Sequence, residues 1–152
     1  VLKTFAKAFP HVLVFESIEG YDLLMIGAMS PLVLDPRKIE NRWKTQELRR
    51  ELAGIQINSG LELIERFTMG ETGIRRFSGS VPINTDANGF LEFRAPNSLH
   101  LKTAPENNLR LSEASAGFEG YLPASHLTHG QIQSLRAKLR ERGEIHLMED
   151  LP

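Results

Sequence analysis

Two apolar runs separated by a short turn constrain the fold of this chain more than any other feature. The first run covers residues 11–15, the second covers residues 22–26, and the stretch 17–20 between them has turn composition. Runs of this length and composition are typical of strands, and so short a connection joins them as an antiparallel hairpin. Neither run alternates with polar residues, so we predict that both faces of both strands are covered.

A helix is predicted before the hairpin. Leu2, Phe5 and Phe9 share one helical stripe, and Pro10 disfavours the helical conformation of the residue before it. No capping residue precedes this helix, so we expect that the natural chain extends further upstream.

Capping and stop signals predict further helices after the hairpin. The first begins at Asp35-Pro36, and the second covers residues 45–53. The third runs from Ser59 to Gly70 with Phe67 buried, the fourth covers residues 71–77, and the last runs from Thr128 to Gly143. Ser59 with Glu62, and Thr128 with Gln131, have the spacing of a capping box. The polar stretch 103–115 carries no such signal and is predicted to be a loop.

Bulk properties exclude several classes of protein. The chain has 152 residues, no cysteine and a formal net charge of −1. The absence of cysteine excludes a disulfide framework and a thiolate metal site. A net charge near zero gives no general attraction to nucleic acid or to an anionic membrane. No apolar run approaches the roughly 18–20 residues that a membrane span needs.

The segment 82–96, PINTDANGFLEFRAP, combines an Asx-rich turn, two acidic residues and an apolar run. Asn84 and Asp86 can accept hydrogen bonds from nearby backbone amides, and Gly89 can take a positive φ angle. The string resembles the segment, NTD followed by LEF or LEY, near the end of spermidine-synthase-like proteins. These are polyamine aminopropyltransferases, often fused to a membrane transporter-like part. Ala87 and Gly89 depart from the resemblance, because the family more often has a second acidic residue and a proline there.

The resemblance implies an α/β fold in which the chain is the C-terminal fragment of a methyltransferase-like Rossmann domain. Residues 1–99 would be the last part of the catalytic domain, with an antiparallel edge hairpin packed with several helices. Residues 100–152 would be a C-terminal extension with a terminal helix. The Gly-rich cofactor turn and the acidic catalytic residues of such enzymes would lie upstream, so we expect no cofactor site in this chain and no activity in isolation.

The activity implied for the parent protein is transfer of an aminopropyl group from decarboxylated S-adenosylmethionine to a diamine such as putrescine. The partner implied is the upstream catalytic half of the parent chain, and the location is cytoplasmic; a membrane anchor on the parent is left open. Asp86, Glu92 and Asn84 are the candidate substrate-binding residues, because a desolvated ammonium group needs carboxylates. The structural alternative is an Asx turn at Asp86 and an ion pair of Glu92 with Arg94 or Arg75.

The alternative function is a non-catalytic binding or dimerisation module of a larger protein. The two functions differ in where they place the side chains of Phe90, Leu91 and Phe93. Packing into a cleft with Asp86 and Glu92 would favour a substrate wall, whereas an exposed patch would favour an interface. A two-stranded hairpin is marginal alone and its edge invites pairing, so we also predict a homodimer through residues 12–27.

The remaining polar motifs carry weaker functional hypotheses. His126 and His129 lack a third ligand, so no metal site is predicted, and His11 has no recognisable partner in the sequence. The last predicted helix is basic, but it lacks the interleaved aromatic residues of a nucleic-acid surface, so no nucleic-acid partner is predicted.

Overall fold

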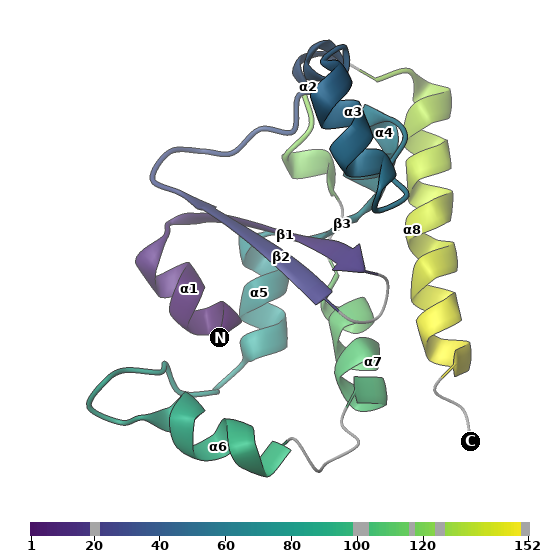
Figure 1. Cartoon of the computed structure of the whole chain (residues 1–152). Coiled ribbons are helices and arrows are strands. Elements are labelled where there is room, and N and C mark those ends of the chain that lie inside the picture. Colours follow the sequence, from purple (N-terminus) through teal and green to yellow (C-terminus); the bar gives the residue numbers. More distant parts are fainter. Residues whose placement is uncertain (19–21, 99–103, 116–117, 124–126, 150–152) are drawn as a thin grey trace.

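The structure is a computed structural model that describes residues 1–18, 22–98, 104–115, 118–123 and 127–149 (Figure 1). These residues form a mixed α/β arrangement with a three-stranded antiparallel sheet and several helices. The strands are β1 (His11–Ile18), β2 (Asp22–Ala28) and β3 (Phe67–Met69). Their order in the sheet is β2-β1-β3, so β1 is central and β2 is an edge strand.

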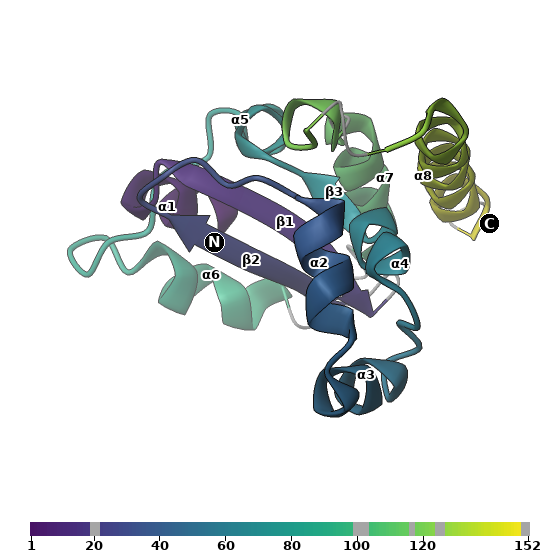
Figure 2. The same ribbon diagram turned by 90° about the horizontal axis from the view of Figure 1, so that it is seen from above.

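Helices cover both faces of this sheet. The helices of the described residues are α1 (Leu2–Ala8), α2 (Pro36–Trp43), α3 (Gln46–Ala53), α4 (Gly60–Glu65), α5 (Glu71–Ser78), α6 (Phe90–Ser98), α7 (Ala104–Ala114) and α8 (His129–Glu149), with a short 3-10 helix η1 (Phe118–Gly120). In Figure 1, α2, α3 and α4 lie above the strands, and the view from above in Figure 2 shows α2 crossing over β1 and β2. The mixed α/β class and the antiparallel hairpin are therefore confirmed.

The upper face of β1 contributes one half of the core. Leu13 and Phe15 pack there with Ile64 of α4, Phe67 of β3 and Leu135 of α8. The rings of Phe15 and Phe67 meet edge to face with centroids 5.8 Å apart. Lys138 of α8 also forms an ion pair with Glu65 of α4 at 2.8 Å.

The lower face of β1 contributes the other half. Val12 and Val14 pack there with Leu2 of α1, Met69 of β3 and Ile74 of α5. Gly27 of β2 lies against the Phe9 ring at the end of the opening helix, because a Cβ atom at this position would come within 2.5 Å of that ring. The rings of Phe5 and Phe9 are tilted by 40° with centroids 4.8 Å apart, and Leu2 is buried, so the predicted stripe of the opening helix is confirmed.

The prediction that both faces of both strands are covered is correct for β1 and wrong for β2. Leu24 and Ile26 face the same side as Phe15 and Leu13, their register partners, yet they are 52% and 40% exposed. Leu24 and Ile26 therefore lie on a part of the upper face that the helices above the sheet leave exposed. The hairpin tip, residues 19–21, lies outside the described residues.

The helix predicted from Ser59 to Gly70 is shorter, and a strand replaces its second half. α4 ends at Glu65, and β3 then pairs with β1 in the register Val14 to Met69 and Phe15 to Phe67. Phe67 and Met69 are both buried, one in each half of the core. Pairing with the central strand therefore overrides the helical spacing of this segment.

The loop predicted over 103–115 is also wrong, because α7 occupies Ala104–Ala114. Ala114 is buried against the lower half of the core, so packing stabilises a helix that the polar sequence does not indicate. α8 runs to Glu149, past the predicted stop at Gly143. The domain boundary at residue 99 stays a prediction, although Phe118 and Leu135 belong to the same core as β1.

The predicted helix starts are confirmed by their hydrogen bonds. Asp35 Oδ1 accepts from the amides of Arg37 and Lys38 at 3.0 and 3.4 Å. Ser59 Oγ accepts from the Glu62 amide at 3.1 Å, while the Glu62 carboxylate accepts from the Asn58 amide at 2.8 Å. The Thr128 box is reciprocal, with Thr128 and Gln131 each bonding the other's amide, at 2.9 and 3.2 Å.

Candidate functional site

The turn before α6 uses its polar side chains to hold the backbone. Asn84 Oδ1 accepts from the Leu91 amide at 2.6 Å, and the Asn84 amide donates to Thr4 Oγ1 of α1 at 3.0 Å. Asn88 Oδ1 accepts from the amides of Thr85 and Phe90 at 3.0 and 3.1 Å. Gly89 has φ +47°, as its place in the turn predicted. Asn84 therefore caps α6 and ties it to α1.

The other two predicted site residues lie on the outside of this turn. Asp86 and Glu92 are exposed, and neither has a hydrogen bond or ion pair to a described residue. In the described part of the chain, the Asx turn expected at Asp86 is made by Asn88 instead. Glu92 forms no ion pair there with Arg94 or Arg75. Arg94 lies over the Phe90 ring and Arg75 donates to Thr72. The role of Asp86, Glu92 and Asn84 in substrate binding stays a prediction.

The apolar residues of α6 lie on the surface. Phe93 is 77% exposed and Leu91 is 40% exposed. Figure 1 shows α6 projecting from the bottom of the molecule, away from the sheet. These side chains therefore do not pack into a cleft with Asp86 and Glu92.

A second polar cluster joins the start of α5 to the C-terminal part of the chain. The Tyr121 hydroxyl donates a hydrogen bond to Glu71 Oε2. Glu71 Oε1 lies 3.3 Å from His11 Nδ1 and also accepts from the Val12 amide at 3.3 Å. Glu71 therefore connects α5, the start of β1 and the segment after η1.

The same contacts shift two pKa values. Partial burial acts to raise the pKa of Glu71, but hydrogen bonds from Tyr121, its own amide, Val12 and His11 outweigh it, and the pKa is lowered. Burial, together with the hydrogen bond to the Glu71 carboxylate and its negative charge, raises the pKa of Tyr121 to about 12. Both shifts favour a neutral tyrosine that donates to an ionised glutamate.

Sequence reasoning missed this cluster and was wrong about His11, which does have a partner. Tyr121 lies 50 residues from Glu71, and no local spacing rule relates the two positions. The only local feature of the cluster in the sequence was the position of Glu71 at the start of a predicted helix. An acidic residue there indicates a helix N-terminus and does not identify Tyr121 or His11 as its hydrogen-bond partner. His126 lies outside the described residues, and His129 contacts only Gln133 among the hydrogen bonds found there.

The free edge of β2 is a third surface feature. Residues 23–28 carry no charged residue and no proline, which natural sheet edges commonly use to prevent pairing. Leu24 and Ile26 are exposed on this strand, and Met29 and Val33 are exposed in the segment that follows it. This edge can accept a further strand.

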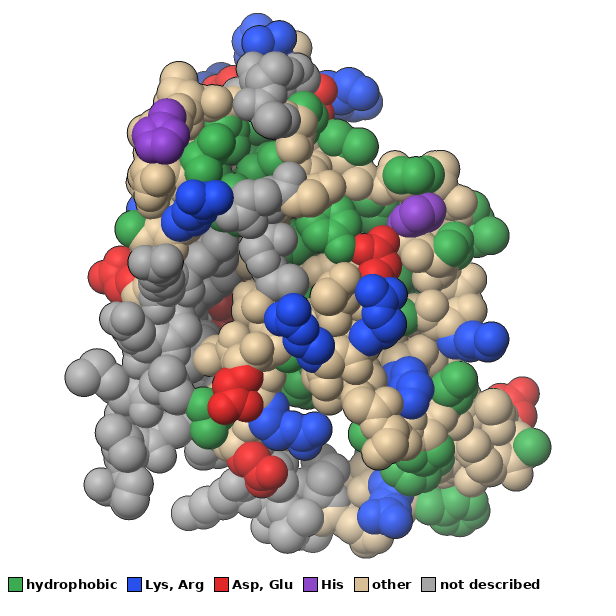
Figure 3. Space-filling model, turned by 180° about the vertical axis from the view of Figure 1, so that it is seen from behind, with side chains coloured by type: hydrophobic (Ala, Val, Ile, Leu, Met, Phe, Trp, Pro, Cys, Tyr) green, Lys and Arg blue, Asp and Glu red, His purple; other side chains and the backbone are tan. Residues whose placement is uncertain are grey.

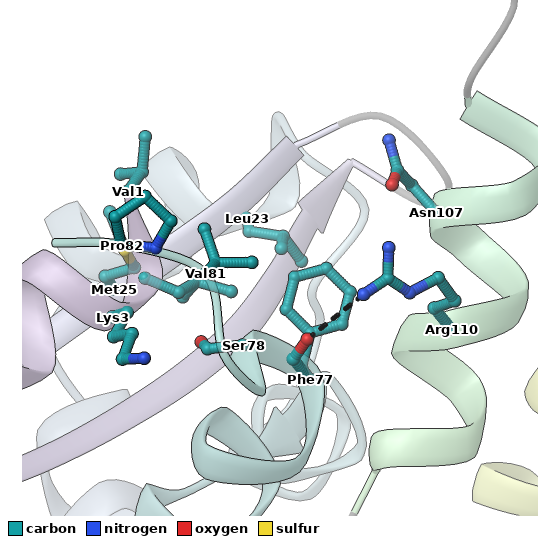
Figure 4. Close-up of a pocket in the computed structure, with 11 residues that line it drawn as sticks. Val1, Lys3, Leu23, Met25, Phe77, Ser78, Val81, Pro82, Asn107 and Arg110 are labelled. Atoms are coloured by element: carbon teal, nitrogen blue, oxygen red, sulfur yellow. Dashed lines mark hydrogen bonds between the residues drawn. The ribbon is translucent and has the colours of Figure 1, made fainter. Parts of the chain in front are cut away.

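A cavity of about 470 Å³ lies below β2 (Figure 4). Its apolar wall includes Leu23 and Met25 of β2, Phe77 of α5, and Val81 and Pro82 of the following segment. The polar lining consists of Lys3, Ser78, Asn107 and Arg110. Asp86, Glu92 and Asn84 are not among its lining residues.

Two other kinds of site are not found in the described part of the chain. No three His, Cys, Asp or Glu side chains there come together as metal ligands. None of its helices combines the length and the apolar character that crossing a bilayer requires.

Comparison with known proteins adds no relative. No protein-family model, no curated protein and no solved structure matches the chain.

Proposed function

We propose that this chain is the sheet-completing C-terminal part of a spermidine-synthase-like aminopropyltransferase. One observation carries the proposal: among the described residues, the outer side of the apolar edge strand β2 pairs with no other strand, whereas the core residues of the central strand β1 are buried. An edge of this kind pairs with another strand when one is available. The chain's role is to extend and close the sheet of the catalytic half.

The exposed side chains indicate which kind of partner fits. A second copy of this chain would pair β2 with β2 in antiparallel fashion and place both copies of Leu24 and Ile26 on the same face. That arrangement would widen the uncovered apolar surface rather than bury it. A strand that brings its own helix, as in an α/β unit, pairs with the edge and also covers Leu24 and Ile26. The geometry therefore favours the catalytic half over the predicted homodimer.

The chemistry belongs to the assembled protein. The chain has no Gly-rich nucleotide turn of the form GxGxxG, so decarboxylated S-adenosylmethionine would be bound by the catalytic half. The diamine nitrogen attacks the carbon beside the sulfonium, the new C–N bond forms as the C–S bond breaks, and methylthioadenosine leaves. A carboxylate of the catalytic half takes the proton of the amine. The resemblance of 82–96 supports this reaction class.

The test compares the 152-residue chain with the whole natural polypeptide that contains it, using putrescine and decarboxylated S-adenosylmethionine. We expect spermidine from the whole polypeptide and none from the 152 residues alone. In the whole polypeptide, Ile26→Lys should greatly lower soluble yield and activity, because it places a charge on the face that the partner's helix would cover. Ile55→Lys is the matched control, since Ile55 is 46% exposed and follows α3, outside the strands of the sheet.

Three results would contradict the proposal. The first is spermidine formation by the 152 residues alone, and the second is no spermidine from the whole polypeptide. The third is a stable dimer of the 152-residue chain on gel filtration that Ile26→Lys dissociates and Ile55→Lys leaves intact, because a second copy would then occupy the edge.

The second candidate function is the non-catalytic binding module, and the exposure of Phe93 and Leu91 on α6 favours it. An aromatic residue exposed to this extent on a short projecting helix is a typical contact residue. If the whole polypeptide is inactive with every diamine tested, and Phe93→Ser abolishes association with a partner without changing its stability, this second function replaces the first.

A further inference from the structure

We infer that the cavity below β2 is a binding site for a small apolar molecule that carries one carboxylate. The apolar body would contact Leu23, Met25 and Val81, and the carboxylate would be bound by Arg110 with help from Asn107. This site is defined by the cavity's own lining residues and is independent of the proposed aminopropyl transfer.

The cavity has the size and the lining of a small-molecule site. Its volume of about 470 Å³ falls in the range of roughly 300–1,000 Å³ that is usual for such sites. One wall is the edge strand β2 and the opposite wall is α7, so the cavity is formed by residues far apart in the sequence (Figure 4). Burial of apolar ligand surface against Leu23, Met25 and Val81 would supply most of the affinity.

Arg110 is already held in a position to bind an anion. Its Nη2 donates to the Phe77 carbonyl at 3.4 Å, and its guanidinium lies over the Phe77 ring, 5.5 Å from the centroid. A guanidinium has five N–H donors, so several are left for a carboxylate. Asn107 lies one helical turn earlier on α7, and Figure 4 shows both side chains on the same side of Phe77.

The charge of the lining excludes a polyamine from this cavity. Among the described residues, Lys3 and Arg110 are the charged side chains of the lining, and no Asp or Glu side chain belongs to it. Lys3 Nζ donates to the Gly79 carbonyl at 2.9 Å, so its positive charge is fixed at the rim. The positive charge is local to the lining, because Lys and Arg side chains lie among Asp and Glu side chains on the face of the molecule seen in Figure 3. An anionic ligand is attracted to this lining and a diamine is repelled.

The test is calorimetric titration of the 152-residue chain with decanoate, decanol and decylammonium, each below the concentration at which it forms micelles. We expect one decanoate to bind per chain, more tightly than decanol, and decylammonium to bind most weakly. Arg110→Gln should weaken decanoate binding by roughly tenfold, because it removes charge-assisted hydrogen bonds. The same variant should leave decanol binding unchanged.

Arg94→Gln is the matched control. Arg94 lies over the Phe90 ring at 5.5 Å, as Arg110 lies over Phe77, but it does not line the cavity. If Arg110→Gln does not fold, Asn107→Ala replaces it as the test, because the Asn107 side chain is exposed and its loss should leave the fold intact. This variant should weaken decanoate binding several-fold. The inference is overturned if decylammonium binds as tightly as decanoate, if decanoate does not saturate, or if Arg94→Gln causes the same loss as Arg110→Gln.

Discussion

The Tyr121 hydroxyl donates a hydrogen bond to the carboxylate of Glu71, 50 residues earlier in the chain. The same carboxylate accepts from the Val12 amide and contacts His11. Tyr121 also packs its ring against Phe67, with centroids 5.5 Å apart. This pair therefore joins the C-terminal part of the chain to the central strand and to α5.

Tyr121→Phe removes the hydrogen bond and keeps the ring. We expect the free energy of unfolding to fall by about 1 kcal/mol, because a partly exposed hydrogen bond to a charged acceptor contributes on that order. Urea unfolding followed by circular dichroism measures the change. Glu71→Gln retains an acceptor and should cost less than Glu71→Ala; equal stabilities of Tyr121→Phe and the unmodified chain would contradict the role given to this bond.

At alkaline pH the pair should weaken through Tyr121. Its pKa is raised from 10.0 to about 12 in the folded state, so its stabilising contribution is complete below pH 10 and is lost as the pH rises through about 12. The absorbance of tyrosinate gives the folded pKa directly. The chain has two tyrosines, so the titration of Tyr121→Phe isolates Tyr121 by difference. A difference titration with its midpoint at the reference value of 10.0 would contradict the raised pKa of Tyr121.

At acidic pH the pair should weaken through Glu71. Its folded pKa lies below the reference value of 4.5, so its contribution is present above that pH and is lost as the pH falls through the lowered folded pKa. We expect the acid-side loss of stability to be smaller in Glu71→Gln than in the unmodified chain. Unfolding midpoints in urea from neutral pH to pH 3 would show the difference, and identical pH profiles would rule it out.

Gly70 should not tolerate a side chain. A Cβ atom at this position would overlap the Tyr121 hydroxyl, which Glu71 holds in place. We expect Gly70→Ala to displace Tyr121 and to destabilise the fold by roughly 1–3 kcal/mol, as overpacking commonly does. Gly120→Ala is the control, because a Cβ atom there meets nothing within 4 Å. Equal stability of the two variants would show that Tyr121 is not confined.

Two residues of the segment 82–96 have different expected roles, a structural one for Asn84 and a functional one for Asp86. Asn84→Ala removes the acceptor for the Leu91 amide and should destabilise the start of α6 by about 1 kcal/mol, the usual cost of losing a cap. Asp86→Asn should change stability by less than about 0.5 kcal/mol, because its side chain is exposed. If Asp86 binds the diamine, the same change raises KM for the diamine in the whole polypeptide; an unchanged KM would remove it from the site.

Local signals predicted much of the secondary structure. Asp35, Ser59 and Thr128 were identified as helix starts because a cap depends on atoms within about four residues of one another. The hairpin was predicted for the same reason, since a short turn leaves two adjacent apolar runs few other ways to pair. The polar residues around Asn84 were also recognised as turn-forming, although Asn88 takes the place given to Asp86.

The errors occur where contacts distant in sequence decide the conformation. Phe67 had a helical spacing, but pairing with Phe15 made it part of a strand, and nothing near either residue indicates that pairing. α7 had a polar sequence, but Ala114 became buried below the sheet.

By itself, then, the sequence determined the helix starts, the hairpin and the turn before α6, because each depends on hydrogen bonds and backbone angles within a few residues. Only the tertiary structure decided that β1 is central and β2 is an edge strand, that Glu71 meets Tyr121, and that Arg110 and Leu23 line the same cavity. Those relationships depend on burial of surfaces far apart along the chain, and the free energy of that burial has no local signature.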